Sequence, residues 1–261
     1  MINLMYVVLM AMLALNVSSD VLVGFSLVDE GLNRSKENSA IQNEAIYKEL
    51  EAAMKRNPEK ARPWFEKAQQ VRQMSDSLYS FAEALKWEIA RQADGKDADL
   101  ENIKGRDNLE AATHVMLAPG IGKGGKLKRA VEAYREGITS MLNDEQQKKI
   151  IRSNLTTDVP EKAKAQGKNW QQYLFENTPV AAAVTLLTKL QTDVRYAEGE
   201  MLHQLVANID VKDVRVNQIN AYVIPNSQTV VRGGRFSAQI IMAAVDSTQR
   251  PEIFVGNTLL K

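Results

Sequence analysis

Cysteine is absent from this sequence of 261 residues, and histidine occurs only twice. Without cysteine the chain has no thiolate catalysis, no cysteine-rich zinc site and no disulfide bond, so its core depends on packing alone. The 33 basic and 32 acidic side chains leave a formal net charge of +1, spread along the chain. No broad basic surface is therefore expected, and the composition does not indicate a nucleic-acid-binding protein.

Residues 1–19 contain no ionisable side chain except the phenol of Tyr6. As an α-helix this stretch would span about 28 Å, close to the thickness of the hydrocarbon core of a bilayer. A cleaved signal peptide is the alternative. The basic start and the small-x-small cleavage site typical of signal peptides are both missing, which favours an uncleaved membrane helix. Its orientation cannot be read, because flanking Lys and Arg residues are lacking.

One face of the predicted membrane helix gathers small and polar residues when the helix is projected at about 100° per residue. Small residues let helices approach closely in lipid, and a buried amide favours a protein neighbour. We therefore predict an interface with partner membrane helices, although such an arc also arises by chance. The predicted interface consists of Asn3, Tyr6, Val7, Met10, Ala11, Ala14, Ser18 and Asp20. No acid or base lies within residues 1–19, so any proton carrier in the membrane must belong to a partner.

Four later segments show helical spacing of apolar residues: 20–54, 59–93, 127–142 and 178–205. Asn57-Pro58 ends the first segment, and Thr178 is the predicted N-cap of the fourth, with Pro179 at its first position. The predicted stripe of the first segment includes Phe25, Val28 and Leu32. Each segment has one apolar seam, so a helical bundle is expected over residues 20–209. Residues 94–126 and 155–177 are expected to be irregular.

The period of the pattern changes after Asp210, where alternating apolar residues predict short strands. The predicted strands lie within residues 211–216, 219–224, 229–231 and 236–242. Only about 50 residues remain for this unit, whereas an immunoglobulin-like sandwich takes about 100. Residues 210–261 are therefore expected to be the beginning of an incomplete β-sandwich. The fold class is mainly α: a transmembrane helix, a helical bundle and the start of an all-β, immunoglobulin-like domain.

No pattern in the sequence indicates an enzyme or a bound cofactor or metal. Residues 120–126 match part of a phosphate-binding loop, but Leu127 stands where Ser or Thr is needed and no strand precedes the glycines. Neither His114 nor His203 has a second ligand at helical spacing. The charged residues between Lys189 and Glu200, among them Arg195 and Glu198, are predicted to form a solvated helix face.

Three stretches together resemble the GldM (PorM) family of gliding-motility and type IX secretion proteins. They are MINLMYVVLMAMLALNVSSDVL (1–22), WQQYLFENTPVAAAVTLLTKLQTDVRYAE (170–198), and IPNS (224–227) followed by VRGGRFSA (231–238). The resemblance implies a single-pass inner-membrane protein with a long periplasmic arm. It also implies a homodimer whose membrane helices sit inside a ring of GldL (PorL) subunits. Proton motive force at that ring would move the arm against outer-membrane-associated ring components.

The chain departs from this family at its start, where family members carry a basic cytoplasmic stretch before the residues equivalent to Met1. A receptor whose helical bundle senses a small ligand is the alternative function, with residues 94–126 as the candidate ligand region. A nucleotide hydrolase is a third reading, which depends on the defective glycine loop.

Overall fold

A computed structural model describes residues 18–211, 218–226, 229, 232–245, 253–255 and 258–260 of the chain. Contacts between residues divide it into two compact units, Met1–Val206 and Ala207–Lys261. The predicted membrane segment lies outside the described residues, apart from Ser18 and Ser19. Among the described residues, no helix combines the length and the apolar character that crossing a membrane requires.

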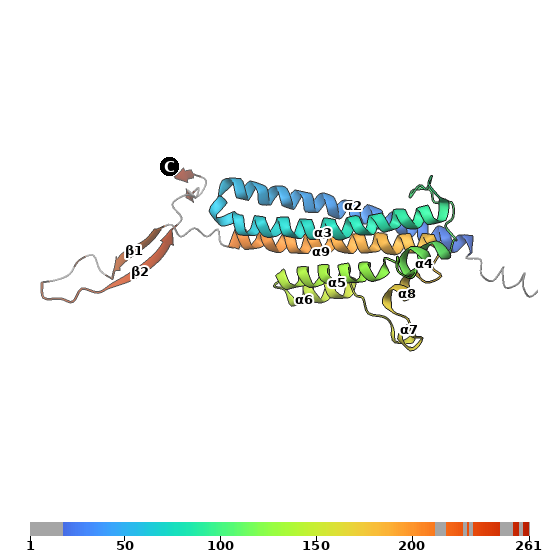
Figure 1. Cartoon of the computed structure of the whole chain (residues 1–261). Coiled ribbons are helices and arrows are strands. Elements are labelled where there is room, and N and C mark those ends of the chain that lie inside the picture. The colour runs from blue at the N-terminus through green and yellow to red at the C-terminus, as the bar shows by residue number, and fades with distance from the viewer. Residues whose placement is uncertain are drawn as a thin grey trace, which may run out of the picture. The chain divides into compact units, whose positions relative to one another are not determined.

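The first unit is helical. Its described helices are α2 (Ser19–Arg56), α3 (Pro58–Asp94), α4 (Glu110–Leu117), α5 (Gly124–Met141), α6 (Glu145–Asn154), α7 (Glu161–Ala165), α8 (Trp170–Phe175) and α9 (Val180–Val211), of which α9 continues past Val206. Figure 1 shows the long helices α2, α3 and α9 side by side, with the shorter α5 and α6 forming a layer along them. The predicted mainly α fold with a helical bundle is confirmed for this unit.

The turn between α2 and α3 follows from two residues. Asn57 ends α2 with its backbone N–H bonded to the carbonyl of Ala53, and Pro58 takes the first position of α3. Proline suits this position because a backbone N–H in the first turn of a helix would have no partner within the helix. In addition, the fixed φ of proline matches that of a helix. The core is apolar: α3 contributes Val71, Leu78, Leu85 and Ile89, and α9 contributes Val180, Leu187, Val194, Met201 and Leu205.

The structure differs from the sequence-based prediction at several helices. The stretches expected to be irregular contain α4, α7 and α8, and α6 was not predicted at all. Helix α9 begins at Val180, and the Thr178 hydroxyl donates to the Leu174 carbonyl instead of capping α9. The first N–H groups of α9, those of Val180 and Ala181, donate to carbonyls of residues 108 and 106 in the α3–α4 loop. This loop therefore caps α9.

The second unit contains two small antiparallel sheets. In the first, β1 (Gln218–Pro225) pairs with β2 (Ala238–Val245), with Gln218 opposite Val245 and Pro225 opposite Ala238. In the second, β3 (Ile253–Val255) pairs with β4 (Thr258–Leu260). The predicted strands at 219–224 and 236–242 are confirmed in large part. Val211 belongs to α9, and the described strands do not form a sandwich, so the immunoglobulin-like fold stays a prediction.

Candidate functional site

Of the eight residues of the predicted membrane interface, the structure describes only Ser18 and Asp20. Both are exposed at the start of α2, where Ser18 is the N-cap residue and makes no side-chain hydrogen bond. The other six, Asn3, Tyr6, Val7, Met10, Ala11 and Ala14, lie outside the described residues. The described part of the site is therefore α2 itself, a continuous helix of 38 residues that extends over about 57 Å.

The first part of α2, residues 19–42, contributes no buried side chain to the bundle. Val28 was predicted on the core-facing stripe but is 54% exposed, and Phe25 and Leu32 are only half-buried. The seam is interrupted by polar residues that face the rest of the bundle, including Ser26, Asp29 and Asn33. Each fully buried aliphatic side chain stabilises a fold by about 1.5–3 kcal/mol, so this part of α2 lacks the usual packing energy.

Three side-chain hydrogen bonds, which we call the tethers, hold residues 19–42 to the bundle. The tethers run from Thr185 Oγ1 to the Phe25 carbonyl, from Thr192 Oγ1 to the Leu32 carbonyl and from Arg106 Nη1 to Ser26 Oγ, each at 3.3 Å. The two tethers donated by threonine are neutral hydrogen bonds, which contribute about 0.5–1.5 kcal/mol each, whereas the tether from Arg106 has a charged donor. All three are near the long end of the normal range. Lys36 adds a cation–π contact, with its Nζ 5.6 Å from the centroid of the Tyr79 ring. Residues 19–42 are therefore attached through a few polar contacts that can exchange with water.

The next turn of α2 enters a polar cluster, which we call the clamp: Asn43, Tyr47, Asp76, Arg195 and Glu198. The Glu198 carboxylate is 1% exposed and accepts from Asn43 Nδ2 at 3.1 Å and from Tyr47 Oη at 2.9 Å. Arg195 Nη1 lies 2.7 Å from the same carboxylate and 3.0 Å from Asp76 Oδ1. Asn43 Nδ2 also donates to the Arg195 carbonyl at 2.9 Å. The clamp therefore joins α2, α3 and α9.

The surroundings in the clamp change the pKa of two of its residues, Tyr47 and Arg195. Burial, together with the neighbouring Glu198 carboxylate, raises the pKa of Tyr47 far above its ordinary value, so the phenol stays a donor. Burial disfavours the charged form of Arg195, but hydrogen bonds to Glu198 and Asp76 outweigh it and raise the pKa of Arg195. Hydrogen bonds to charged groups are worth about 1.5–3 kcal/mol each, so the clamp holds α2 more strongly than the tethers do.

Gly199 allows α2 and α9 to approach each other at the clamp. A Cβ atom at Gly199 would lie 2.7 Å from Oδ1 of Asn43. No such restriction applies to Gly24 and Gly31 in the first part of α2, where a Cβ would have no neighbour within 4 Å. Gly24 and Gly31 are exposed, whereas Gly199 lies where α9 meets Asn43 of α2.

A second polar group links α3 to α9. Gln191 is buried and donates through Nε2 to Glu83 Oε2 at 2.9 Å, and Lys86 Nζ lies 3.2 Å from the same oxygen. Burial raises the pKa of the Glu83 carboxyl, but the hydrogen bonds from Gln191 and Lys86 more than offset it. The pKa of Glu83 is therefore lower than its ordinary value.

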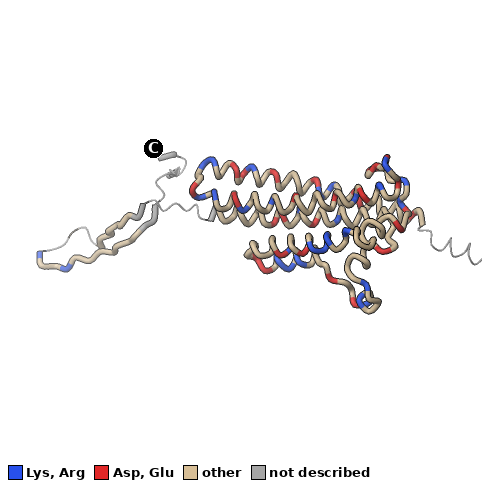
Figure 2. Tube along the Cα trace, in the orientation of Figure 1, with Lys and Arg blue, Asp and Glu red and all other residues tan. Residues whose placement is uncertain are grey.

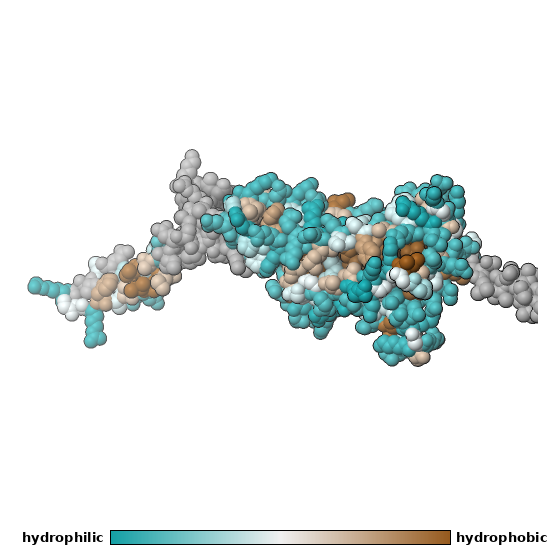
Figure 3. Space-filling model, in the orientation of Figure 1, coloured by the Kyte–Doolittle hydropathy of each residue, from teal (hydrophilic) through white to brown (hydrophobic). Residues whose placement is uncertain are grey.

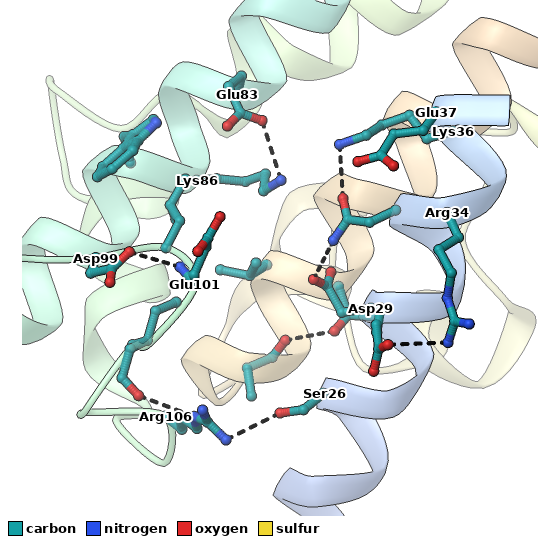
Figure 4. Close-up of a pocket in the computed structure, with 18 residues that line it drawn as sticks. Ser26, Asp29, Arg34, Lys36, Glu37, Glu83, Lys86, Asp99, Glu101 and Arg106 are labelled. Atoms are coloured by element: carbon teal, nitrogen blue, oxygen red, sulfur yellow. Dashed lines mark hydrogen bonds and ion pairs between the residues drawn. The ribbon is translucent and has the colours of Figure 1, made fainter. Parts of the chain in front are cut away.

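A polar cleft of about 710 Å³ separates the first part of α2 from α3 and the α3–α4 loop. Figure 4 shows Lys86 on the α3 side, Glu101 and Arg106 on the loop, and Asp29 and Arg34 on α2. The loop is held in place by Asp94, whose carboxylate accepts from the backbone N–H groups of residues 104 and 105. Because its walls carry charges of both signs, the cleft can be filled by water.

The glycine-rich segment at residues 120–126 is part of a loop and the start of α5. Residues 118–123 form the loop before α5, and its backbone donates to its own preceding turn, for example from Gly122 N–H to the Ala118 carbonyl at 2.7 Å. Lys123 pairs with Glu88. Within the described part of the chain, no three His, Asp or Glu side chains gather as metal ligands would.

The clamp was not predicted from the sequence. Glu198 and Arg195 were predicted on a solvated face, yet Glu198 is buried and only 16% of the Arg195 side chain is exposed. One signal was available: Glu198 shares a helix face with Val194, Met201 and Leu205, all of which are buried. A lone acid on an apolar face needs partners, and those partners come from α2 and α3, which are distant in sequence.

Comparison with known families identifies both units. The model of the GldM N-terminal domain matches residues 20–208, and the model of the GldM second domain matches residues 210–261. A comparison with curated proteins gave no match. The two family matches meet near the end of α9 and together cover the chain from residue 20 onward. The chain therefore belongs to the GldM (PorM) family of gliding-motility and type IX secretion components.

Proposed function

We propose that this protein is a mechanical coupler of a proton-driven motor in the inner membrane. Force would enter through the membrane helix at residues 1–19 and pass along α2 into the bundle. The observation that carries this proposal is the continuity of α2, one helix that begins next to the membrane segment and ends beyond the clamp. A continuous hydrogen-bonded helix transmits displacement along its axis because its interior backbone groups are already paired.

The remaining parts of the proposal come from family membership. The chain is proposed to be a homodimer whose membrane helices are surrounded by a GldL-type ring of multi-spanning subunits. The bulk of the chain would lie in the periplasm, and its β end would lead toward outer-membrane-associated ring components. Because residues 1–19 carry no acid or base, the proton-carrying group would belong to the ring.

We infer a mechanical role and not an enzymatic one. The charged groups of the clamp are bonded to one another and to neutral side chains of α2, as expected for a structural junction of three helices. A catalytic carboxylate would instead need an open path to a substrate. Glu198, at 1% exposure, has none in this structure.

Interruption of α2 tests the coupler directly. Ser35 is an exposed position in the middle of residues 19–42, so Ser35→Pro should kink the helix without touching the core. We expect loss of secretion and gliding in cells that carry this variant, with thermal unfolding of the bundle little changed. Ser35→Ala is the matched control and should retain both activities. Full secretion by the Ser35→Pro variant would disprove transmission along α2.

The proposed membrane interface has its own test. Large side chains at Ala11 and Ala14 should prevent close helix approach, so the double change to Phe should reduce co-purification with a multi-spanning membrane partner. Phe at Met5 and Met12, which project from the opposite side of the predicted helix, provides the control. Equal recovery of the partner with both pairs would rule out this face as the interface.

A ligand-sensing receptor is the second candidate function, and the polar cleft is the observation that favours it. The cleft includes Asp99, Glu101 and Ile103 from the region predicted to bind a ligand. A receptor should be stabilised by its ligand in proportion to ligand concentration. A thermal-shift screen with small polar and charged compounds would separate the two functions, because a coupler should show no concentration-dependent stabilisation.

A further inference from the structure

We propose that residues 19–42 of α2 form a lever that swings over the polar cleft, with the clamp as its pivot. The proposal builds on the coupler function and specifies which part of the arm moves first. Under force from the membrane segment, the tethers would break and the cleft would widen or close. Residues 43–56 would remain fixed to α3 and α9.

The contrast in burial along α2 places the pivot. All four buried residues of α2, namely Asn43, Ile46, Tyr47 and Leu50, lie in a single stretch of eight positions. The 24 residues before them contribute none. Since protein interiors resist deformation and lightly packed segments open first, the boundary between the two behaviours falls at Asn43.

The surroundings of residues 19–42 allow this motion. The tethers use hydroxyl and guanidinium groups at 3.3 Å, which can exchange to water without leaving a buried charge unpaired. On the side facing α3 the lever borders the cleft, which polar residues such as Asn33 and Glu37 line together with apolar ones. Lys36 contacts α3 there, with its Nζ 5.6 Å from the centroid of the Tyr79 ring. Opening therefore breaks no contact of a fully buried α2 side chain, because residues 19–42 contribute none, and this favours a hinge at the start of the packed stretch.

Hydrogen exchange on the full chain in detergent measures the pivot. We expect the backbone amides of residues 23–42 to exchange at least tenfold faster than those of residues 43–54 in the same helix. Breaking the pivot with Asn43→Ala should extend fast exchange toward residue 50. Uniform protection along the whole of α2 would overturn the lever.

A chemical lock tests whether the motion matters for function. The chain has no cysteine, so introduced pairs are unique. Leu32→Cys with Thr192→Cys joins the lever to α9 at a tether, and Glu44→Cys with Arg72→Cys joins α2 to α3 beside the pivot, where their side chains now form an ion pair at 2.6 Å. Both pairs would be closed with the same short thiol cross-linker in cells that depend on this protein for secretion.

We expect the lever lock to abolish secretion and the pivot lock to preserve it, with melting temperatures of both locked proteins at or above that of the parent. Secretion that persists with the lever lock closed would contradict the lever proposal. It would not contradict the coupler proposal, which Ser35→Pro tests separately. Equal loss with both locks would also overturn the lever, because the effect would not be specific to residues 19–42.

Discussion

Glu198 shows how one acidic residue can organise the junction of three helices. Its carboxylate accepts from Asn43 and Tyr47 of α2 and pairs with Arg195, which reaches Asp76 of α3. Arg195 also stacks over the Tyr79 ring, with 4.5 Å between the guanidinium carbon and the ring centroid. A buried charge is tolerated only when it is paired and hydrogen-bonded, so these contacts depend on one another.

Removing the Glu198 carboxylate should therefore destabilise the bundle severely. Glu198→Ala would leave the Arg195 charge without its closest partner and the Tyr47 phenol without its acceptor, while Asn43 would keep only its bond to the Arg195 carbonyl. We expect a loss of roughly 3–5 kcal/mol in the free energy of unfolding, measured by urea denaturation. Glu200→Ala, two positions along the same helix and only partly buried, should cost far less. Similar losses for the two variants would show that the clamp is not an energetic centre.

Two glycines in helix interiors should respond to alanine in opposite directions. Gly→Ala normally stabilises a helix by about 0.5–1 kcal/mol, and Gly31, with open space around it, should follow this rule. At Gly199 the new methyl group would displace the Asn43 amide and break its bond to Glu198, for a net loss of about 1 kcal/mol. Thermal unfolding of both variants checks this. Stabilisation by Gly199→Ala would contradict the close approach of α2 and α9.

At the scale of helices, the prediction from sequence agrees with the structure where neighbouring residues determine the position of a helix. Asn57-Pro58 marks the α2–α3 turn, and long apolar stripes mark α3, α5 and α9. Helix α6 was not predicted because only Ile151 of its ten residues is buried, which leaves no apolar stripe, although Asp144 was available as a local N-cap signal. The cleft was also beyond prediction, since it depends on how far α2 stands from α3. No local pattern encodes that distance.

The link between α3 and α9 should weaken in acid. Because the pKa of Glu83 is lower in the folded chain than its ordinary value, its contribution to stability is present above about pH 4.5. That contribution is lost as the pH falls through the lowered pKa. The difference in unfolding free energy between the parent and Glu83→Gln should therefore shrink between pH 7 and pH 3. A difference in unfolding free energy that stays constant over this range would show that the contacts of Glu83 with Gln191 and Lys86 do not stabilise the fold.

For the whole molecule, charge and apolar surface are distributed differently in the two units. Figure 2 shows acidic and basic residues interspersed along the long helices, and the visible face of the bundle in Figure 3 is mostly hydrophilic. The second unit instead exposes large apolar side chains on both strands of its hairpin. They are Tyr222, Val223, Ile224, Ile240, Ile241 and Met242. The two units are therefore expected to differ in stability.

These surfaces predict the order in which a protease cleaves the two units. A two-stranded sheet alone is marginally stable in water, and Met242, at 76% exposure, shows how little of the hairpin is buried. The bundle has a continuous apolar core and the clamp. Limited proteolysis of this chain should therefore remove the β unit first and leave a resistant fragment ending near Val211, identified by mass spectrometry. Because the clamp holds α2 to α9 inside that fragment, Glu198→Ala should shorten its lifetime. If the bundle were instead cut before the β unit, its core could not be the rigid body against which α2 transmits force.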